Sequence, residues 1–268
     1  MTDPYARYSW PRTAHRLVGL FEIPDVAIRE IEFDRLDRVL RMLDARRAVD
    51  GRGHAILVEQ PREADLAHAG VVLVAEKRAR SPLMEESSVE KLHEIDDHIA
   101  IGSAGHVADA RQLVDFARQQ AQVDRLRYGE PIDVETLAGV VTDHIQEYTQ
   151  TGGARPFGVS LLVAGVDDGE PRLFGTDPSG TATEWTASVI GADRDAILDD
   201  LETNYRPDAD LDGGIHTALR ALASVRDAFE SSEVAIATID VETKEFRTLD
   251  DEEVEAHLDE LDVEDIDE

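Results

Sequence analysis

The segments HAILVEQ at residues 54–60 and GVVLVA at residues 70–75 decide the fold class of this chain. Both are short apolar runs rich in β-branched residues, which is typical of strands buried inside a sandwich of sheets. A third strand is predicted at about His98–Gly102. The same criteria predict later strands at Gly158–Val166, Pro171–Gly175 and Thr183–Gly191, and a closing hairpin of Val234–Ile239 with Glu245–Leu249.

Helices with one apolar face are predicted between these groups of strands. The first carries Asp109 away from its apolar face, which consists of Ala110, Leu113, Val114, Ala117 and Ala121. The second follows Asp133 as N-cap, and its apolar positions are Val134, Leu137, Ala138, Val141, Ile145 and Tyr148. Another helix is predicted from about Asp193, followed by one that carries on one face Ile215, Ala218, Leu219, Leu222 and Phe229.

The order of elements is strands, two helices, strands, two helices and strands. This order predicts an α+β fold, specifically a four-layer αββα sandwich. We divide the chain into an N-terminal segment 1–53, a sandwich domain 54–250, and an acidic helix and tail 251–268. The N-terminal segment contains a predicted helix from Phe33 to about Val49. The acidic helix carries on one side Val254, Leu258 and Leu261.

The chain is strongly acidic. Its 58 Asp and Glu residues against 27 Lys and Arg residues give a formal net charge of −31 at pH 7. Such a surface repels itself at low ionic strength, whereas in molar salt the Debye length falls to about 3 Å and the repulsion largely vanishes. The charge therefore suits a high-salt cytoplasm. It argues against nucleic-acid binding, which needs basic patches.

Two absences restrict the chemistry further. The sequence has no cysteine, which excludes disulfides, thiol catalysis and cysteine metal sites. No apolar run approaches the length of about 18 residues that a membrane helix needs. We therefore expect no membrane segment and a cytoplasmic protein.

Several segments from Gly70 onward are distinctive, among them GVVLVAEKRARSPLM from Gly70, SSVEKLHEIDDHI from Ser87 and QEYTQTGGARPFGVSLLVAGV from Gln146. In these segments and their order, the sequence resembles the α-type subunits of the archaeal proteasome. The resemblance implies the αββα fold of N-terminal-nucleophile hydrolases. It also implies that the chain forms heptameric rings with other proteasome α subunits, which stack on rings of proteasome β subunits and control substrate access.

The resemblance also implies a binding pocket. Pockets between neighbouring α subunits of the family receive the C-terminal tails of a regulatory AAA ATPase. Lys91 would face the tail carboxylate, which attracts an ammonium group, and Gly105 would allow close backbone approach. Glu32 and Arg35 would be further pocket or interface charges. The alternatives are a solvated surface lysine for Lys91 and a plain turn for Gly105.

Before Gly70 the resemblance is weaker. The N-termini of family members gate the channel, and Arg16 and Pro24 match gate positions of the family. Ala14 and His15 replace a Tyr-Asp pair, and Phe33 replaces a tyrosine. In the family, Tyr and Asp side chains hold the gate open by hydrogen bonds. Phenylalanine cannot donate such a bond, so the sequence predicts an altered gate.

The sequence predicts that this chain is not an enzyme. Catalytic relatives expose an N-terminal threonine at the start of the first strand. Here no Thr lies between Thr13 and Thr136, and no Ser lies between Ser9 and Ser81. We therefore favour a non-catalytic ring subunit, without cofactor, over an N-terminal-nucleophile hydrolase. A degenerate α paralogue with an altered gate stays an alternative.

No metal site is predicted. Asp208, Asp210 and Asp212 copy the first half of a calcium loop, but the position of its closing glutamate is Leu219, so helix capping is favoured. Two further candidates, His93 and His98, flank an acidic stretch. They are interpreted as solvated or strand-edge histidines, because no histidine pair has the spacing of a helical zinc site.

Overall fold

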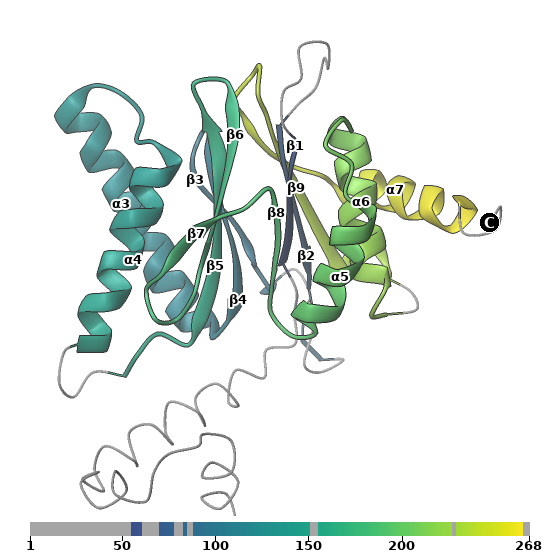
Figure 1. The fold of residues 1–268 in the computed structure, drawn as a ribbon, viewed down its shortest axis with the longest axis horizontal. Coiled ribbons are helices and arrows are strands. Elements are labelled where there is room, and N and C mark those ends of the chain that lie inside the picture. Colours follow the sequence, from purple (N-terminus) through teal and green to yellow (C-terminus); the bar gives the residue numbers. More distant parts are fainter. Residues whose placement is uncertain are drawn as a thin grey trace, which may run out of the picture. The chain divides into compact units, whose positions relative to one another are not determined.

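The structure is a computed structural model that describes residues 55–60, 70–77, 83–84, 88–150, 155–226 and 229–264. These residues build two sheets of five strands each, covered by helices on their outer faces (Figure 1). The arrangement confirms the predicted four-layer αββα sandwich. In this part of the chain, no helix is long and apolar enough to cross a membrane.

Of the described strands, sheet A contains the first two, the last two and, at one edge, a strand from the middle of the sequence. Its spatial order is β10 (Phe246–Thr248), β9 (Val234–Asp240), β2 (Gly70–Glu76), β1 (Ala55–Gln60) and β8 (Ala187–Ile190). All neighbours in it pair antiparallel. The strands β1 and β2 lie where the sequence predicts them.

Sheet B is an antiparallel meander in which sequence order and spatial order agree. Its strands are β3 (Leu92–Asp96), β4 (Ile99–Gly105), β5 (Val159–Asp167), β6 (Glu170–Thr176) and β7 (Ala182–Glu184). The sequence analysis missed β3. This strand contains the charged residues Glu94 and Asp96 and is interrupted by a register shift between them, so it lacks the continuous apolar run of its neighbours.

The predicted strand Thr183–Gly191 is wrong as a single strand. Its first part belongs to β7 and pairs with β6 in sheet B, whereas its second part is β8 and pairs with β1 in sheet A. The chain crosses between the sheets at Trp185, which packs against the core that both sheets share. A β-carbon at Gly175 would lie 3.0 Å from the indole nitrogen of Trp185, so the glycine leaves room for this crossing.

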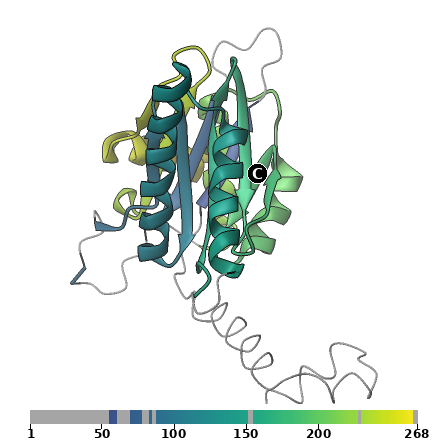
Figure 2. The same cartoon turned by 90° about the vertical axis from the view of Figure 1, so that its left-hand side faces the viewer.

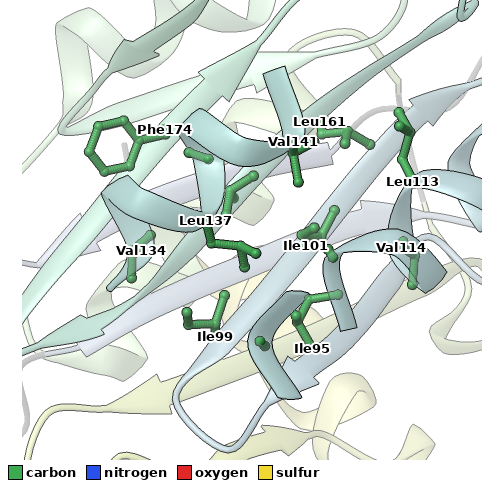
Figure 3. Packing of buried hydrophobic residues seen from close by; sticks show 14 of the residues in the cluster. Ile95, Ile99, Ile101, Leu113, Val114, Val134, Leu137, Val141, Leu161 and Phe174 are labelled. Atoms are coloured by element: carbon green, nitrogen blue, oxygen red, sulfur yellow. The ribbon is translucent and has the colours of Figure 1, made fainter. Parts of the chain in front are cut away.

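Two helices cover the outer face of sheet B, α3 (Val107–Tyr128) and α4 (Val134–Gln150). Figure 2 shows them side by side in front of the sheet. Their predicted apolar faces are confirmed, since both contribute to one buried cluster, and Figure 3 shows Leu137 of α4 directed toward Ile101 of β4. The α4 N-terminus is capped from outside the helix, because the Asp167 carboxylate accepts the Val134 N–H at 3.0 Å.

The outer face of sheet A is covered by α5 (Arg194–Asn204) and α6 (Leu211–Ala223), and α7 (Asp251–Glu264) packs beside α6 (Figure 1). A short 3₁₀ helix, Ser231–Glu233, precedes β9. Val254 of α7 is buried in the same apolar cluster as α5 and α6. The sequence predicts Phe229 on the apolar face of this helix, but α6 ends at Ala223. Phe229 packs against the same cluster from the segment that follows.

Candidate functional site

Lys91 and Gly105 lie near the same end of sheet B. Lys91 directly precedes β3, and its carbonyl oxygen accepts a hydrogen bond from the Ser103 N–H at 2.9 Å. The Ser103 hydroxyl also donates to this carbonyl, at 3.4 Å. Gly105 ends β4, two residues after Ser103. Strand pairing therefore brings together the two described residues that the sequence assigned to one pocket.

The backbone conformation and close packing at position 105 require a glycine. Its φ of 130° lies in a region that side chains rarely adopt. A β-carbon at this position would lie 2.4 Å from the carbonyl oxygen of Gly158. That carbonyl accepts the His106 N–H at 2.9 Å, so the start of α3 is drawn close to β5. The close backbone approach expected at Gly105 is made here with the chain's own segment at Gly158.

Asp109 holds this corner together. Its carboxylate accepts a hydrogen bond from Arg155 at 2.5 Å and one from the Gly158 N–H at 2.7 Å. The prediction that Asp109 points away from the packed side of its helix is wrong, because its side chain is only 7% exposed. Burial alone would raise the pKa of Asp109, but the hydrogen bonds from Arg155 and Gly158 outweigh it, and the pKa lies below the ordinary value.

Helical periodicity could not reveal this role, since it predicts apolar burial and says nothing about ion partners. The partner Arg155 lies 46 positions further along the chain. Asp109 thus fixes the geometry of the site, because it ties the first turn of α3 to Gly158, the residue that Gly105 approaches closely.

His93 and His98 are buried, so the solvated alternative is wrong for both, whereas the strand-edge alternative holds for His93, which lies on the edge strand β3 of sheet B. His93 is 6% exposed and His98 is 8% exposed. His93 Nε2 lies 3.4 Å from the Ser103 hydroxyl, and His98 Nε2 lies 2.9 Å from the Ile132 carbonyl oxygen. Burial, with a smaller contribution from Arg118, lowers the pKa of His93 below its ordinary value. The neutral His93 ring thus lies next to Ser103, which in turn binds the Lys91 carbonyl oxygen.

The other predicted site residues lie outside the described part of the chain. These are the pocket residues Glu32 and Arg35 and the gate residues Arg16, Pro24 and Phe33. A cavity of about 310 Å³ is present in the described structure, but it is lined by α5, α6 and Leu261 and does not include Lys91.

The choice between calcium binding and helix capping at Asp208–Gly213 is settled by the hydrogen bonds. The Asp210 side chain accepts the Gly213 N–H at 2.9 Å, as the N-cap of α6. Leu219, at the position of a closing calcium ligand, is buried in the apolar cluster. Asp210 therefore serves as the N-cap of α6.

Comparison with known proteins places the chain in a family. The family model for proteasome subunits matches residues 67–239. Proteasome subunit alpha 1 of Haloarcula marismortui is 64% identical over 195 residues, which cover 72% of this chain and 75% of that protein. Proteasome subunit alpha of Natronomonas pharaonis is 61% identical over 196 residues, covering 72% and 77%.

The similarity extends to a third organism at lower identity. Proteasome subunit alpha of Methanoculleus marisnigri is 48% identical over 193 residues, covering 72% of this chain and 80% of that protein. The haloarchaeal relatives agree with the acidic composition of this sequence. On its sandwich fold and on these matches, the chain belongs to the proteasome subunit family, among the archaeal α-type subunits.

Proposed function

We propose that this chain is a non-catalytic subunit of the outer ring of the proteasome core particle, where it controls substrate access and binds the tails of a regulatory ATPase. The observation that carries the proposal is the pairing of Lys91 with Ser103, two residues before Gly105, at the end of sheet B where Asp109 fixes the Gly158 segment. An ammonium group at such a position suits a terminal carboxylate. A neighbouring subunit would supply the other wall.

The non-catalytic role is supported by chemistry at the first strand of the sandwich. This strand, β1, begins at Ala55. Residues 14–80 contain no Thr, Ser or Cys, so no hydroxyl or thiol is available at or near its start to act as a nucleophile. The protein would therefore act as a structural partner of α and β subunits. Its net charge of −31 would suit a cytoplasm of high salt. A peptidase assay with a threonine-directed inhibitor tests the alternative, since inhibitable activity of the chain alone would contradict the proposal.

Assembly is the first test. Light scattering of the purified chain in molar KCl, alone and mixed with its matching β subunit, measures the particle mass. We expect a mass of about seven times 29.6 kDa, or a larger stacked particle with the β subunit. A monomer in both samples would contradict the simple ring and favour a degenerate paralogue, or one that enters rings only beside another α subunit.

The role of Lys91 has a separate test, with a matched control in the same chain. The sequence contains only three lysines, Lys77, Lys91 and Lys244, and Lys244 is exposed in the hairpin between β9 and β10. We expect Lys91→Gln to weaken binding of a peptide from the ATPase C-terminus to the assembled ring by about tenfold or more, because a charge-assisted hydrogen bond contributes about 1.5–3 kcal/mol. Lys244→Gln should leave it unchanged. Equal binding by both variants would exclude Lys91 from the site.

A further inference from the structure

Two histidines and a glutamate meet between α6 and α7, on the opposite side of the sandwich from Lys91. Among the residues that the structure describes, His216, His257 and Glu260 place one possible ligand atom each within 4.8 Å of one another. His216 lies on α6, and His257 and Glu260 lie one turn apart on α7. The sequence analysis predicted no metal site, because the two histidines are 41 positions apart and share no helix.

The distances are those of ligands around one ion. His216 Nε2 lies 3.0 Å from Glu260 Oε2 and 3.3 Å from His257 Nδ1. A tetrahedral zinc ion with ligands at about 2.0–2.1 Å holds neighbouring ligand atoms about 3.3 Å apart. Two of the three pairs of atoms are therefore close to the spacing that zinc requires, and the third pair, between His257 and Glu260, lies within 4.8 Å.

Hydrogen bonds among these three side chains depend on a single shared proton. A neutral imidazole has one N–H and one bare nitrogen. The best arrangement of neutral rings shares the single N–H of His216 between His257 Nδ1 and Glu260 Oε2. One hydrogen then serves two acceptor atoms. A metal ion would accept a lone pair from all three residues at once.

The surroundings favour a cation and remain accessible to it. Asp212 and Glu253 add negative charge near His257, besides Glu260. The Glu260 side chain is 67% exposed and that of His216 is 23% exposed, so an ion can reach the cluster from solvent.

We propose that His216, His257 and Glu260 bind a divalent transition metal ion, with zinc as the best match, which links the C-terminal helix α7 to α6. Two imidazole nitrogens select zinc-like ions over magnesium and calcium, which prefer all-oxygen sites. A His₂Glu set leaves the fourth tetrahedral position for water. His216 also lines the cavity of about 310 Å³ between α5 and α6, which offers room for that water.

The physical consequence is stabilisation of α7. The first turn of this helix is already fixed, because Asp250 Oδ1 accepts the Glu253 N–H and Glu253 accepts the Asp250 N–H, a reciprocal capping arrangement. Further along, Leu258 and Leu261 are only partly buried against the core. An ion bound at His257 and Glu260 would hold this second part of the helix to the sandwich.

The test is calorimetric titration of the untagged full-length chain with ZnCl₂ in molar KCl, after chelator treatment, with MgCl₂ as the comparison ion. We expect one zinc ion per chain and no comparable signal with magnesium. Substitution by Co²⁺ should give the visible absorption of a tetrahedral site. Zinc should also raise the thermal unfolding temperature.

Three variants separate this site from the general acidity of the surface. Since residues that merely support metal ligands contribute about 10–100-fold in affinity, we expect Glu260→Gln and His257→Asn each to weaken zinc binding by more than about tenfold. Glu255→Gln removes the same charge from an exposed position on α7 and should bind zinc like the unchanged chain. If His257→Asn does not fold, Glu260→Gln decides alone. Equal affinity in all variants, or zinc binding no tighter than magnesium binding, would overturn the proposal.

Discussion

The two helical layers of this sandwich differ in the surfaces that they present. Near its C-terminus, α3 exposes large apolar side chains: Val123 is 43% exposed, Leu126 87% and Tyr128 67%. The outer positions of α7 are instead acidic, with Asp251, Glu252, Glu255 and Asp259 exposed. In a chain with a net charge of −31, exposed apolar residues gathered on one helix mark a surface suited to contact another protein.

This difference indicates that the two helical layers have different roles. If the ring proposal is correct, the α3–α4 layer contacts a neighbouring proteasome subunit, and the α6–α7 layer faces solvent and can receive an ion. The inner faces of the two layers are alike, since both bury aliphatic residues against a sheet. The layers should therefore respond differently to changes at their polar anchors and outer faces.

The largest effect is expected at the anchor of the α3 layer. Asp109→Asn removes the carboxylate that binds Arg155 and the Gly158 N–H. Losing hydrogen bonds to a buried charged group should lower the free energy of unfolding by about 1–3 kcal/mol. Denaturant unfolding at pH 7.5 and fixed KCl measures this. Asp115→Asn is the matched control, because Asp115 lies on the same helix with 71% of its side chain exposed, and it should change stability little. Equal losses would refute the anchoring role of Asp109.

An intermediate effect concerns pH and His93, which supports β3 beneath α3. Because burial lowers the pKa of His93 in the folded chain, the unfolded chain takes up a proton first as the pH falls below the ordinary value of 6.5. Stability should thus be unaffected by this group above that pH. Below it, stability should fall by at most about 1.4 kcal/mol per pH unit until the folded-state pKa is reached.

The variant that tests this pH dependence is His93→Gln. Chelator-treated samples unfolded by denaturant at pH 8 and at pH 5.5 should show a smaller loss of stability on acidification for the variant than for the unchanged chain. The cost of repacking is the same at both pH values and cancels in this comparison. Identical losses would mean that His93 is protonated equally in both states.

The smallest effect on folding, but a large one on assembly, is expected at Leu126. Its side chain is 87% exposed, so Leu126→Glu should change the free energy of unfolding of the subunit by no more than about 0.5 kcal/mol. If the α3 surface contacts a neighbouring subunit, the new charge should reduce the particle mass measured by light scattering. Ala256→Glu, at an exposed position of α7, should leave the particle intact. An intact particle in both variants would remove the distinction between the layers.

How far the sequence could predict this protein depended on the kind of contact. Apolar periodicity located the buried faces of α3, α4 and α6, because a helix buries residues at regular spacing whatever its partner is. It failed at Asp109 and at His93, since their burial depends on hydrogen-bond partners that are distant in the sequence. For the same reason, the resemblance of SSVEKLHEIDDHI to known α subunits indicated Lys91 as a site residue without indicating its contact with Ser103.

The sequence by itself determined the sandwich class, the family, the missing nucleophile and the charge, because these follow from composition, local pattern and residue identity. Only the tertiary structure decided where the predicted strand Thr183–Gly191 divides between the sheets, and which side chains meet across elements. His216 and Glu260 come within 3.0 Å although 44 positions separate them. The packing of α7 on α6 creates that proximity, and no local pattern in the chain encodes the distance between two helices.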